Sequence, residues 1–150
     1  MITLRPATLA DAVFLLRLRN DPLTRANSLN PNEVTPDQHA IWLATTLGSA
    51  TRHLYVAEAS FTVTDSLGMV RLDLGDRDTA EVSITVAPEC RGQGWAGPML
   101  EAAHAEAKRL GITHLVATVK PANTASLRAF LRAGYHITAP ARTLTLEREG

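Results

Sequence analysis

The spacing of hydrophobic positions changes along the chain between the period of a helix and the period of a strand. Apolar residues at helical spacing predict helices over residues 8–19, 35–47, 98–110 and 123–134. Alternating or short apolar runs predict strands over residues 1–6, 54–63 (one strand, or two joined at 58–60), 68–74, 82–86, 115–119 and 144–146. This order predicts a mixed α/β fold, in which a central twisted sheet carries helices on both faces.

Several helix boundaries are marked by side chains that can satisfy free main-chain groups. Thr8 is placed to cap the first helix, and Thr35 is placed to cap the second, with Gln38 completing a capping box. Gly48 follows the last apolar position of the second helix and predicts its end. Residues 20–31 are polar with little periodicity, so we expect a loop between these helices.

The length and net charge of the chain limit the kinds of function that it can have. The chain has 150 residues, which suits one domain over 1–150. Its 15 Lys and Arg balance 15 Asp and Glu, and this zero net charge argues against nonspecific capture of nucleic acid or an anionic membrane. No apolar run approaches the ~20 residues of a membrane span, and the first residues lack the apolar core of a signal peptide. The lone Cys90 excludes an internal disulfide and a cysteine metal site, so we expect a soluble, cytoplasmic domain without a metal.

Residues 88–97 join a predicted strand to a predicted helix through several small residues. A helix N-terminus leaves main-chain N–H groups unpaired, and small residues let a phosphate approach them closely. The segment therefore predicts a phosphate or diphosphate site, and a glycine-rich connection without a ligand is the alternative. Gly92, Gly94 and Gly97 also match the spacing of dinucleotide-binding folds, but the next predicted strand ends without the carboxylate that those folds need.

Two motifs in this half of the chain together resemble one family. The first is Arg91-x-x-Gly94-x-Ala96, and the second is Asn123-x-x-Ser126-x-x-x-Phe130-x-x-x-Gly134-Tyr135. They are similar to the coenzyme A signature and the later segment of the GCN5-related N-acetyltransferase (GNAT) superfamily, and the similarity in element order covers essentially the whole chain. The resemblance implies a GNAT fold with a splayed strand pair, acetyl-CoA as co-substrate, and N-acetyltransferase activity.

The resemblance also implies a role for particular residues. Main-chain amides of the signature turn would hold the diphosphate, here those of Arg91, Gly92, Gln93, Gly94, Trp95 and Ala96. The preceding strand would pair with the pantetheine arm through Ile84, Thr85 and Val86. Asn123 would contact the cofactor or simply cap its helix. Ser126 would line the site as a catalytic candidate or simply complete the first turn of that helix.

The implied reaction is direct attack of a primary amine on the acetyl thioester. The amine must first lose a proton, because an alkylammonium with a pKa near ~10 has no free electron pair at neutral pH. Glu81 is the candidate base, often acting through water in this superfamily, and a solvated strand end is its alternative interpretation. Phe130 stands where many members carry a tyrosine acid, so we expect it to pack against the cofactor. The proton for the leaving thiolate would come from another group, from water, or from no donor.

The acceptor must be inferred from the N-terminal half. The candidate substrate-binding residues are Arg19, Asn20, Arg25, His39, Trp42 and Arg71. Arginines match phosphates and an indole stacks on a base or sugar, although each residue is also explained as a surface charge or as core. The pattern resembles, more weakly, acetyltransferases of the pseudaminic acid pathway, which act on nucleotide-linked amino-sugars. A protein N-terminal acetyltransferase of the ribosomal-protein type and a non-catalytic coenzyme A-binding module are the alternatives, and assembly as a homodimer is left open.

Overall fold

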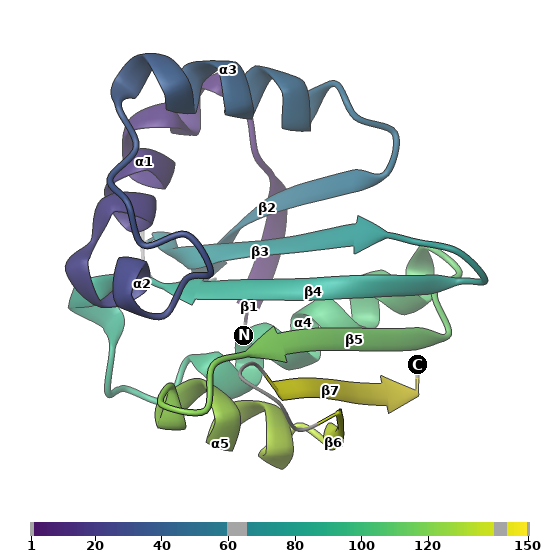
Figure 1. The fold of residues 1–150 in the computed structure, drawn as a ribbon. Coiled ribbons are helices and arrows are strands. Elements are labelled where there is room, and N and C mark those ends of the chain that lie inside the picture. Colours follow the sequence, from purple (N-terminus) through teal and green to yellow (C-terminus); the bar gives the residue numbers. More distant parts are fainter. Residues whose placement is uncertain (1, 60–65, 140–143, 150) are drawn as a thin grey trace.

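The computed structural model describes residues 2–59, 66–139 and 144–149, which form a seven-stranded sheet with helices on both faces (Figure 1). Its strand order is β1-β2-β3-β4-β5-β7-β6. The strands are β1 (Ile2–Pro6), β2 (Arg52–Ala59), β3 (Ser66–Leu74), β4 (Thr79–Val86), β5 (His114–Val119), β6 (His136–Ala139) and β7 (Leu144–Glu149). Neighbours are antiparallel except β4 and β5, which are parallel. The predicted mixed α/β fold is confirmed.

Helices cover the two faces of the sheet through separate hydrophobic clusters. The helices are α1 (Ala12–Asn20), α2 (Pro22–Ala26), α3 (Pro36–Leu47), α4 (Ala96–Arg109) and α5 (Thr124–Arg132), with 3-10 turns η1 (Leu9–Asp11) and η2 (Pro88–Cys90). Successive residues of β2 point to opposite faces. Accordingly Leu54 and Val56 belong to the cluster with α1 and α3, whereas Tyr55 and Ala57 belong to the larger cluster with α4 and α5.

The predicted caps of the first two long helical segments are confirmed. Thr8 caps η1, which leads directly into α1, and Asp11 accepts the N–H of Thr8 at 2.8 Å. Thr35 and Gln38 form the reciprocal capping box of α3, with hydrogen bonds of 3.1 and 3.0 Å. These contacts join residues three positions apart, so the local sequence is enough to specify them.

The short helix α2 corrects the expectation of a loop after residue 20. Asp21 Oδ2 accepts the N–H of Thr24 at 3.1 Å, and Pro22 occupies the first helical position. Five residues are too few to display a hydrophobic period, so the pattern did not predict this helix. Strand β6 was also not predicted, because its four residues are held by pairing with β7 rather than by a pattern of their own.

The apolar positions Leu127, Phe130 and Leu131 of the predicted helix were expected to share one buried face of α5, and one of them does not. Leu127 and Phe130 pack in the larger cluster, but Leu131 is 44% exposed. Consecutive helical residues lie about 100° apart, so Phe130 and Leu131 do not both face the core. Residues 60–63 of the strand predicted over 54–63 lie outside the described residues. A turn over 64–66 was also expected, but Ser66 already belongs to β3, and residues 64–65 lie outside the described residues.

Strands β4 and β5 separate soon after they start, as expected for a splayed pair. Their ladder joins Thr79–Glu81 to His114–Val116 only, although both strands continue beyond it. At the far end of β4, the N–H of Ala87 donates to Leu67 O at 2.7 Å, toward β3. Because peptide groups alternate in direction along a strand, those of Ile84 and Val86 point into the gap. No helix in the described ranges is long and apolar enough to cross a lipid bilayer.

Candidate active site

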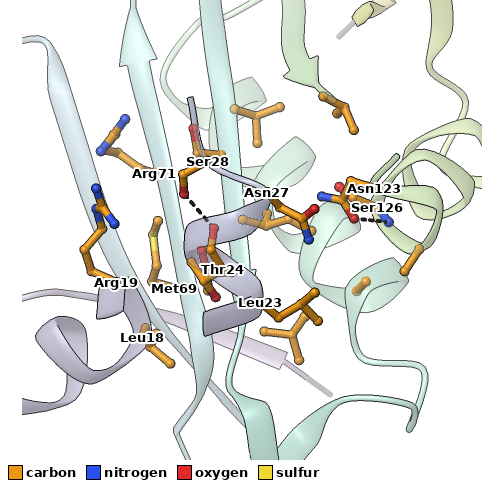
Figure 2. A pocket seen from close by; sticks show the side chains of 18 of the residues that line it. Leu18, Arg19, Leu23, Thr24, Asn27, Ser28, Met69, Arg71, Asn123 and Ser126 are labelled. Carbon is orange, nitrogen blue, oxygen red and sulfur yellow. Dashed lines mark hydrogen bonds between the residues drawn. The ribbon is translucent and has the colours of Figure 1, made fainter. Parts of the chain in front are cut away.

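A cavity of about 940 Å³ extends from the gap between β4 and β5 to the face of the sheet that α1 and α3 cover. Figure 2 shows Asn123 and Ser126 on one side of α2, and Arg19, Met69 and Arg71 on the other. We call these two parts the turn end, lined by the segment before α4 and the start of α5, and the arginine end, lined by α1, α3 and β3.

The turn before α4 keeps its main-chain N–H groups free. Gly92 and Gly94 have φ angles of +74° and +82°, which glycine adopts without strain. Within the described ranges, the main-chain N–H groups of residues 92–97 do not appear as donors in the main-chain hydrogen bonds of turns, loops and caps. A Cβ at Gly92, Gly94 or Gly97 would meet no atom within 4 Å, so the space around the turn is open. With the positive end of α4 behind them, these N–H groups suit an anionic ligand such as a diphosphate.

Two arginines fix this turn to the N-terminal helices. Arg91 Nη2 donates to Asp21 Oδ2 at 2.6 Å and to Thr24 Oγ1 at 3.1 Å. Arg17 makes a two-pronged contact with Glu89 at 2.8 and 2.9 Å, and this hydrogen bonding lowers the pKa of Glu89 to about 2. Arg91 Nη2 is therefore engaged within the protein. The main-chain N–H of Arg91 donates to Pro88 O at 3.3 Å, so, contrary to the expectation, it is not available to hold a diphosphate, and the free main-chain donors begin at Gly92.

Strand β4 lines the middle of the cavity. Ile84, Thr85 and Val86 all contribute to its wall beside the gap. Glu81 also lines the cavity and is exposed, at the last position where β4 pairs with β5. The three residue steps from Glu81 to Ile84 span roughly 10 Å of strand, a distance that a chain of water molecules can bridge.

The wall opposite β4 is formed by α5. Asn123 Oδ1 caps the helix by accepting the N–H of Ser126 at 3.3 Å, and both residues also line the cavity, so capping and lining coexist here. Phe130 lines the cavity as well, with its ring edge-on to Tyr135 at 4.9 Å between centroids. Burial raises the pKa of Tyr135 to about 12, and its hydroxyl is enclosed in the core without a partner among the described residues. Neither aromatic residue offers an accessible acid to the cavity.

The arginine end contains four of the residues expected to bind substrate. Arg19, His39, Trp42 and Arg71 line it together. The His39 and Trp42 rings are 5.4 Å apart, and the Arg71 guanidinium lies 5.7 Å from the centre of the Trp42 ring. His39 is buried, not the solvated residue considered as its alternative, and burial followed by the charge of Arg19 lowers its pKa. The imidazole is therefore neutral at pH 7.

The structure does not bring three of the expected site residues to the cavity wall. The amide of Asn20 donates to Val34 O at 2.7 Å and accepts the Val34 N–H at 2.8 Å, so it fixes the segment before α3. Arg25 donates to Pro31 O at 3.0 Å, in the same connecting segment. The side chain of Gln93 turns back to Glu89 O at 3.3 Å, although its main-chain N–H remains free in the turn.

The cavity also has residues that sequence reasoning missed. The side chains of α2 line its centre, and Asp21 followed by Pro22 is a helix-start signal that could have revealed this helix. Lys120 lines the turn end and its Nζ donates to Ala26 O at 3.1 Å, which ties the C-terminal end of α2 to the end of β5. Nothing local signals this contact, because its two residues are 94 positions apart. Within the described part of the chain, no three or more His, Cys, Asp or Glu residues gather where a metal ion could be held.

Comparisons with known proteins give a consistent result. Residues 1–136 match the family described as the acetyltransferase (GNAT) domain, whereas curated protein sequences give no significant match. The spermidine N-acetyltransferase of Vibrio cholerae, solved with CoA and spermine, is 18% identical with a TM-score of 0.88, covering 99% of this chain and 95% of that one.

Two further solved structures are similar in fold. One, provisionally assigned as a phosphinothricin N-acetyltransferase, is 26% identical with a TM-score of 0.81, covering 99% of this chain and 98% of that one. The aminoglycoside acetyltransferase AAC(6')-Ib, solved with coenzyme A, is 15% identical with a TM-score of 0.82, covering 99% and 95%. Identities this low establish shared architecture and leave the acceptor to be argued from the cavity itself.

Proposed function

This chain belongs to the GNAT acetyltransferase family, and we propose how its residues move an acetyl group from acetyl-CoA to the amine of a small molecule. It is an N-acetyltransferase with acetyl-CoA as its co-substrate. When bound, acetyl-CoA supplies a thioester carbonyl that a neutral amine attacks directly. One observation carries the proposal: free N–H groups of a helix-start turn and the opened edge of β4 lie in one cavity with Glu81.

The turn end holds the cofactor. The main-chain N–H groups from Gly92 to Ala96 bind the diphosphate, and the first turn of α4 adds its positive end. Arg91 acts through its ion pair with Asp21, which keeps the turn in place, because its main-chain N–H already donates to Pro88 O. Asn123 and Phe130 line the cavity opposite β4 and contact the pantetheine arm from that side.

The opened edge of β4 positions the acetyl group. The peptide groups of Ile84 and Val86 point into the gap, so they offer the pantetheine arm a strand-like partner, with Thr85 between them. A main-chain N–H near Val86 donates to the oxygen that gains negative charge as the amine attacks. A donor fixed in a sheet needs no reorganisation during the reaction, which is the basis of oxyanion stabilisation.

Glu81 accepts the proton that the amine must lose. The carboxylate lines the cavity on the same strand as Val86, and it acts through water because roughly 10 Å of strand separates it from Ile84. Proton transfer by a positioned base typically contributes about 10²–10⁴-fold to a rate. Glu81→Gln keeps the size of the side chain and removes its basicity, so kcat should fall within this range while the affinity for acetyl-CoA is retained.

The leaving thiolate has no tyrosine to protonate it, because Phe130 carries no acidic hydrogen. Ser126 lines the same wall one helical turn before Phe130, and its hydroxyl is the nearest alternative on α5 for donating a hydrogen bond to the sulfur. Water in the cavity completes the proton transfer.

The acceptor binds at the arginine end. Arg91 holds the start of α2 through Asp21, and Lys120 holds its end through the Ala26 carbonyl. A helix fixed at both ends beside the cavity suits a small acceptor better than a protein N-terminus. A nucleotide-linked amino-sugar remains a candidate acceptor, with Arg19 and Arg71 available for its phosphates and Trp42 beside them. Asn20 and Arg25 no longer support it, since their side chains hold the connecting segment.

Calorimetry with acetyl-CoA tests the cofactor site. Gly94→Glu places a carboxylate in the open space of the turn, and Gly111→Glu adds the same group and the same left-handed strain at the other end of α4. We expect saturable binding to the wild type and to Gly111→Glu, and a loss of at least about 100-fold in Gly94→Glu, since several charge-assisted hydrogen bonds are blocked. Equal affinity in the two variants would exclude this turn as the diphosphate site. A mass-shift screen of small-molecule amines against peptides then tests the acceptor class.

A further inference from the structure

The charges at the arginine end are not balanced internally, and they differ from what a polyamine requires. Arg71 and Arg19 line this end (Figure 2). Glu81 is the carboxylate that lines the cavity nearby. Arg71 is already neutralised, because its Nε bonds Asp73 at 3.2 Å. Its planar group also lies over the Trp42 ring, which fixes its orientation.

Arg19 has no such counter-charge. Its Nη2 donates to the carbonyl oxygen of Asn30 at 2.9 Å, and its Nη1 is enclosed without an acceptor among the described residues. The neighbouring His39 is buried and neutral, so it neither adds a charge nor compensates one. An enclosed guanidinium nitrogen without an acceptor is costly unless a ligand supplies the acceptor, and an anionic ligand would also balance the charge of the half-buried Arg19.

The positions of these groups indicate the shape of the ligand that fits. In the β3–β4 ladder Arg71 is opposite Ser83, and Asp73 is opposite Glu81, so Arg71 and Glu81 are diagonal neighbours roughly 7–8 Å apart. Glu81 makes no ion pair within the described ranges, and neither does Arg19. Among the described residues, the arginine end therefore presents one uncompensated negative group, Glu81, and one uncompensated positive group, Arg19, near the neutralised Arg71. Lys120, which also lacks a carboxylate partner there, lies at the turn end and donates to Ala26 O.

We propose that the acceptor is an amine that carries its own anionic group, a phosphate or a carboxylate, which Arg19 and Arg71 bind while the amine lies toward Glu81. This inference rests on the proposed acetyl transfer and specifies its substrate class. The planar forks of two arginines match either anion by paired hydrogen bonds. A polyamine has positive charge at both ends, so one end would face Arg19 without a partner.

Binding to the wild-type protein saturated with CoA tests the proposal without requiring turnover. Two matched pairs separate the two sources of negative charge: glucosamine 6-phosphate against glucosamine, and glutamate against its dimethyl ester, with spermidine as the polycation. We expect the anionic member of at least one pair to bind about 10–100-fold more tightly than its neutral partner, and spermidine to bind no better than the neutral amines. The pair that shows this preference identifies the source of the anion.

Variants assign the preference to the arginines. Arg19→Gln should reduce the anionic preference about 10-fold or more, with the loss in acceptor KM rather than in kcat, and Arg19→Lys should restore part of it. Arg25→Gln is the matched control, since Arg25 lies outside the cavity wall, and it should leave the preference unchanged.

The outcomes also separate this inference from the proposed function. If acetyl-CoA binds and amines are acetylated, but neither pair favours its anionic member or Arg19→Gln keeps the full preference, the anionic acceptor is refuted and the acetyltransferase remains. If acetyl-CoA does not bind to the wild-type protein, the proposed function and this inference fall together.

Discussion

At Gly68, β3 lies too close to β4 for a side chain, and this point is beside the part of β4 that is proposed to hold the acetyl group. Gly68 pairs with Val86 in the ladder. A Cβ added at Gly68 would lie 2.0 Å from the carbonyl oxygen of Thr85 and 3.1 Å from Met99 Cε. Gly68→Ala therefore forces the two strands apart at this point, because backbone carbonyls do not yield as a flexible side-chain end does.

The size of the effect follows from the distances. The Thr85 oxygen must move from 2.0 Å to beyond 3.0 Å, so β4 must shift by at least about 1 Å. Overpacking of this kind typically lowers the free energy of unfolding by about 1–3 kcal/mol. A displacement of about 1 Å at reacting groups can lower a rate by about 10²-fold, so kcat should fall much more than acetyl-CoA affinity.

Gly75→Ala is the matched control, since it lies at the other end of β3 and its Cβ would have an ordinary contact of 3.7 Å to Thr79 O. Urea denaturation measures the free energy of unfolding, and release of free thiol from acetyl-CoA measures turnover. We expect Gly75→Ala to match the wild type in both. If Gly68→Ala unfolds at the same urea concentration as Gly75→Ala, the strands accommodate the methyl group and the reasoning is refuted.

Three further predictions concern α5 and the turn. Asn123→Ala should lower the free energy of unfolding by about 1 kcal/mol and also weaken acetyl-CoA binding. The control variant Thr35→Ala removes another helix cap and should lower the free energy of unfolding alone. Equal acetyl-CoA affinity in the two variants would leave Asn123 as a cap only. Phe130→Leu should cost about 1 kcal/mol and leave the shape of the pH–rate profile unchanged, and loss of a limb would contradict the absence of an acid there. Pairing with Arg17 lowers the pKa of Glu89 from 4.5 to about 2, so the ion pair stabilises the fold fully above about pH 4.5 and less as the pH falls toward 2. The difference in Tm between the wild type and Arg17→Gln should therefore shrink over this interval. A constant difference would argue against the pair.

The sequence by itself determined the features that depend on neighbours along the chain. The Thr8 cap, the Thr35 capping box, the end of α3 before Gly48 and the Asn123 cap all join residues a few positions apart, and all were predicted. The turn before α4 is of the same kind, because its free N–H groups follow from the start of a helix after small residues. The turn end of the cavity could therefore be predicted from residues that are neighbours in the sequence.

The tertiary structure decided the arginine end. Arg19 and Asn20 are adjacent in α1, yet their side chains point about 100° apart around the helix, so Arg19 lines the cavity and Asn20 holds Val34. Arg71 is brought near Arg19 and Trp42 by packing between β3, α1 and α3, which no short segment encodes. Contacts between residues far apart in the sequence depend on how layers pack and how strands register. The choice of acceptor therefore depends on the assembled fold, whereas the turn proposed to hold the cofactor is specified by local sequence.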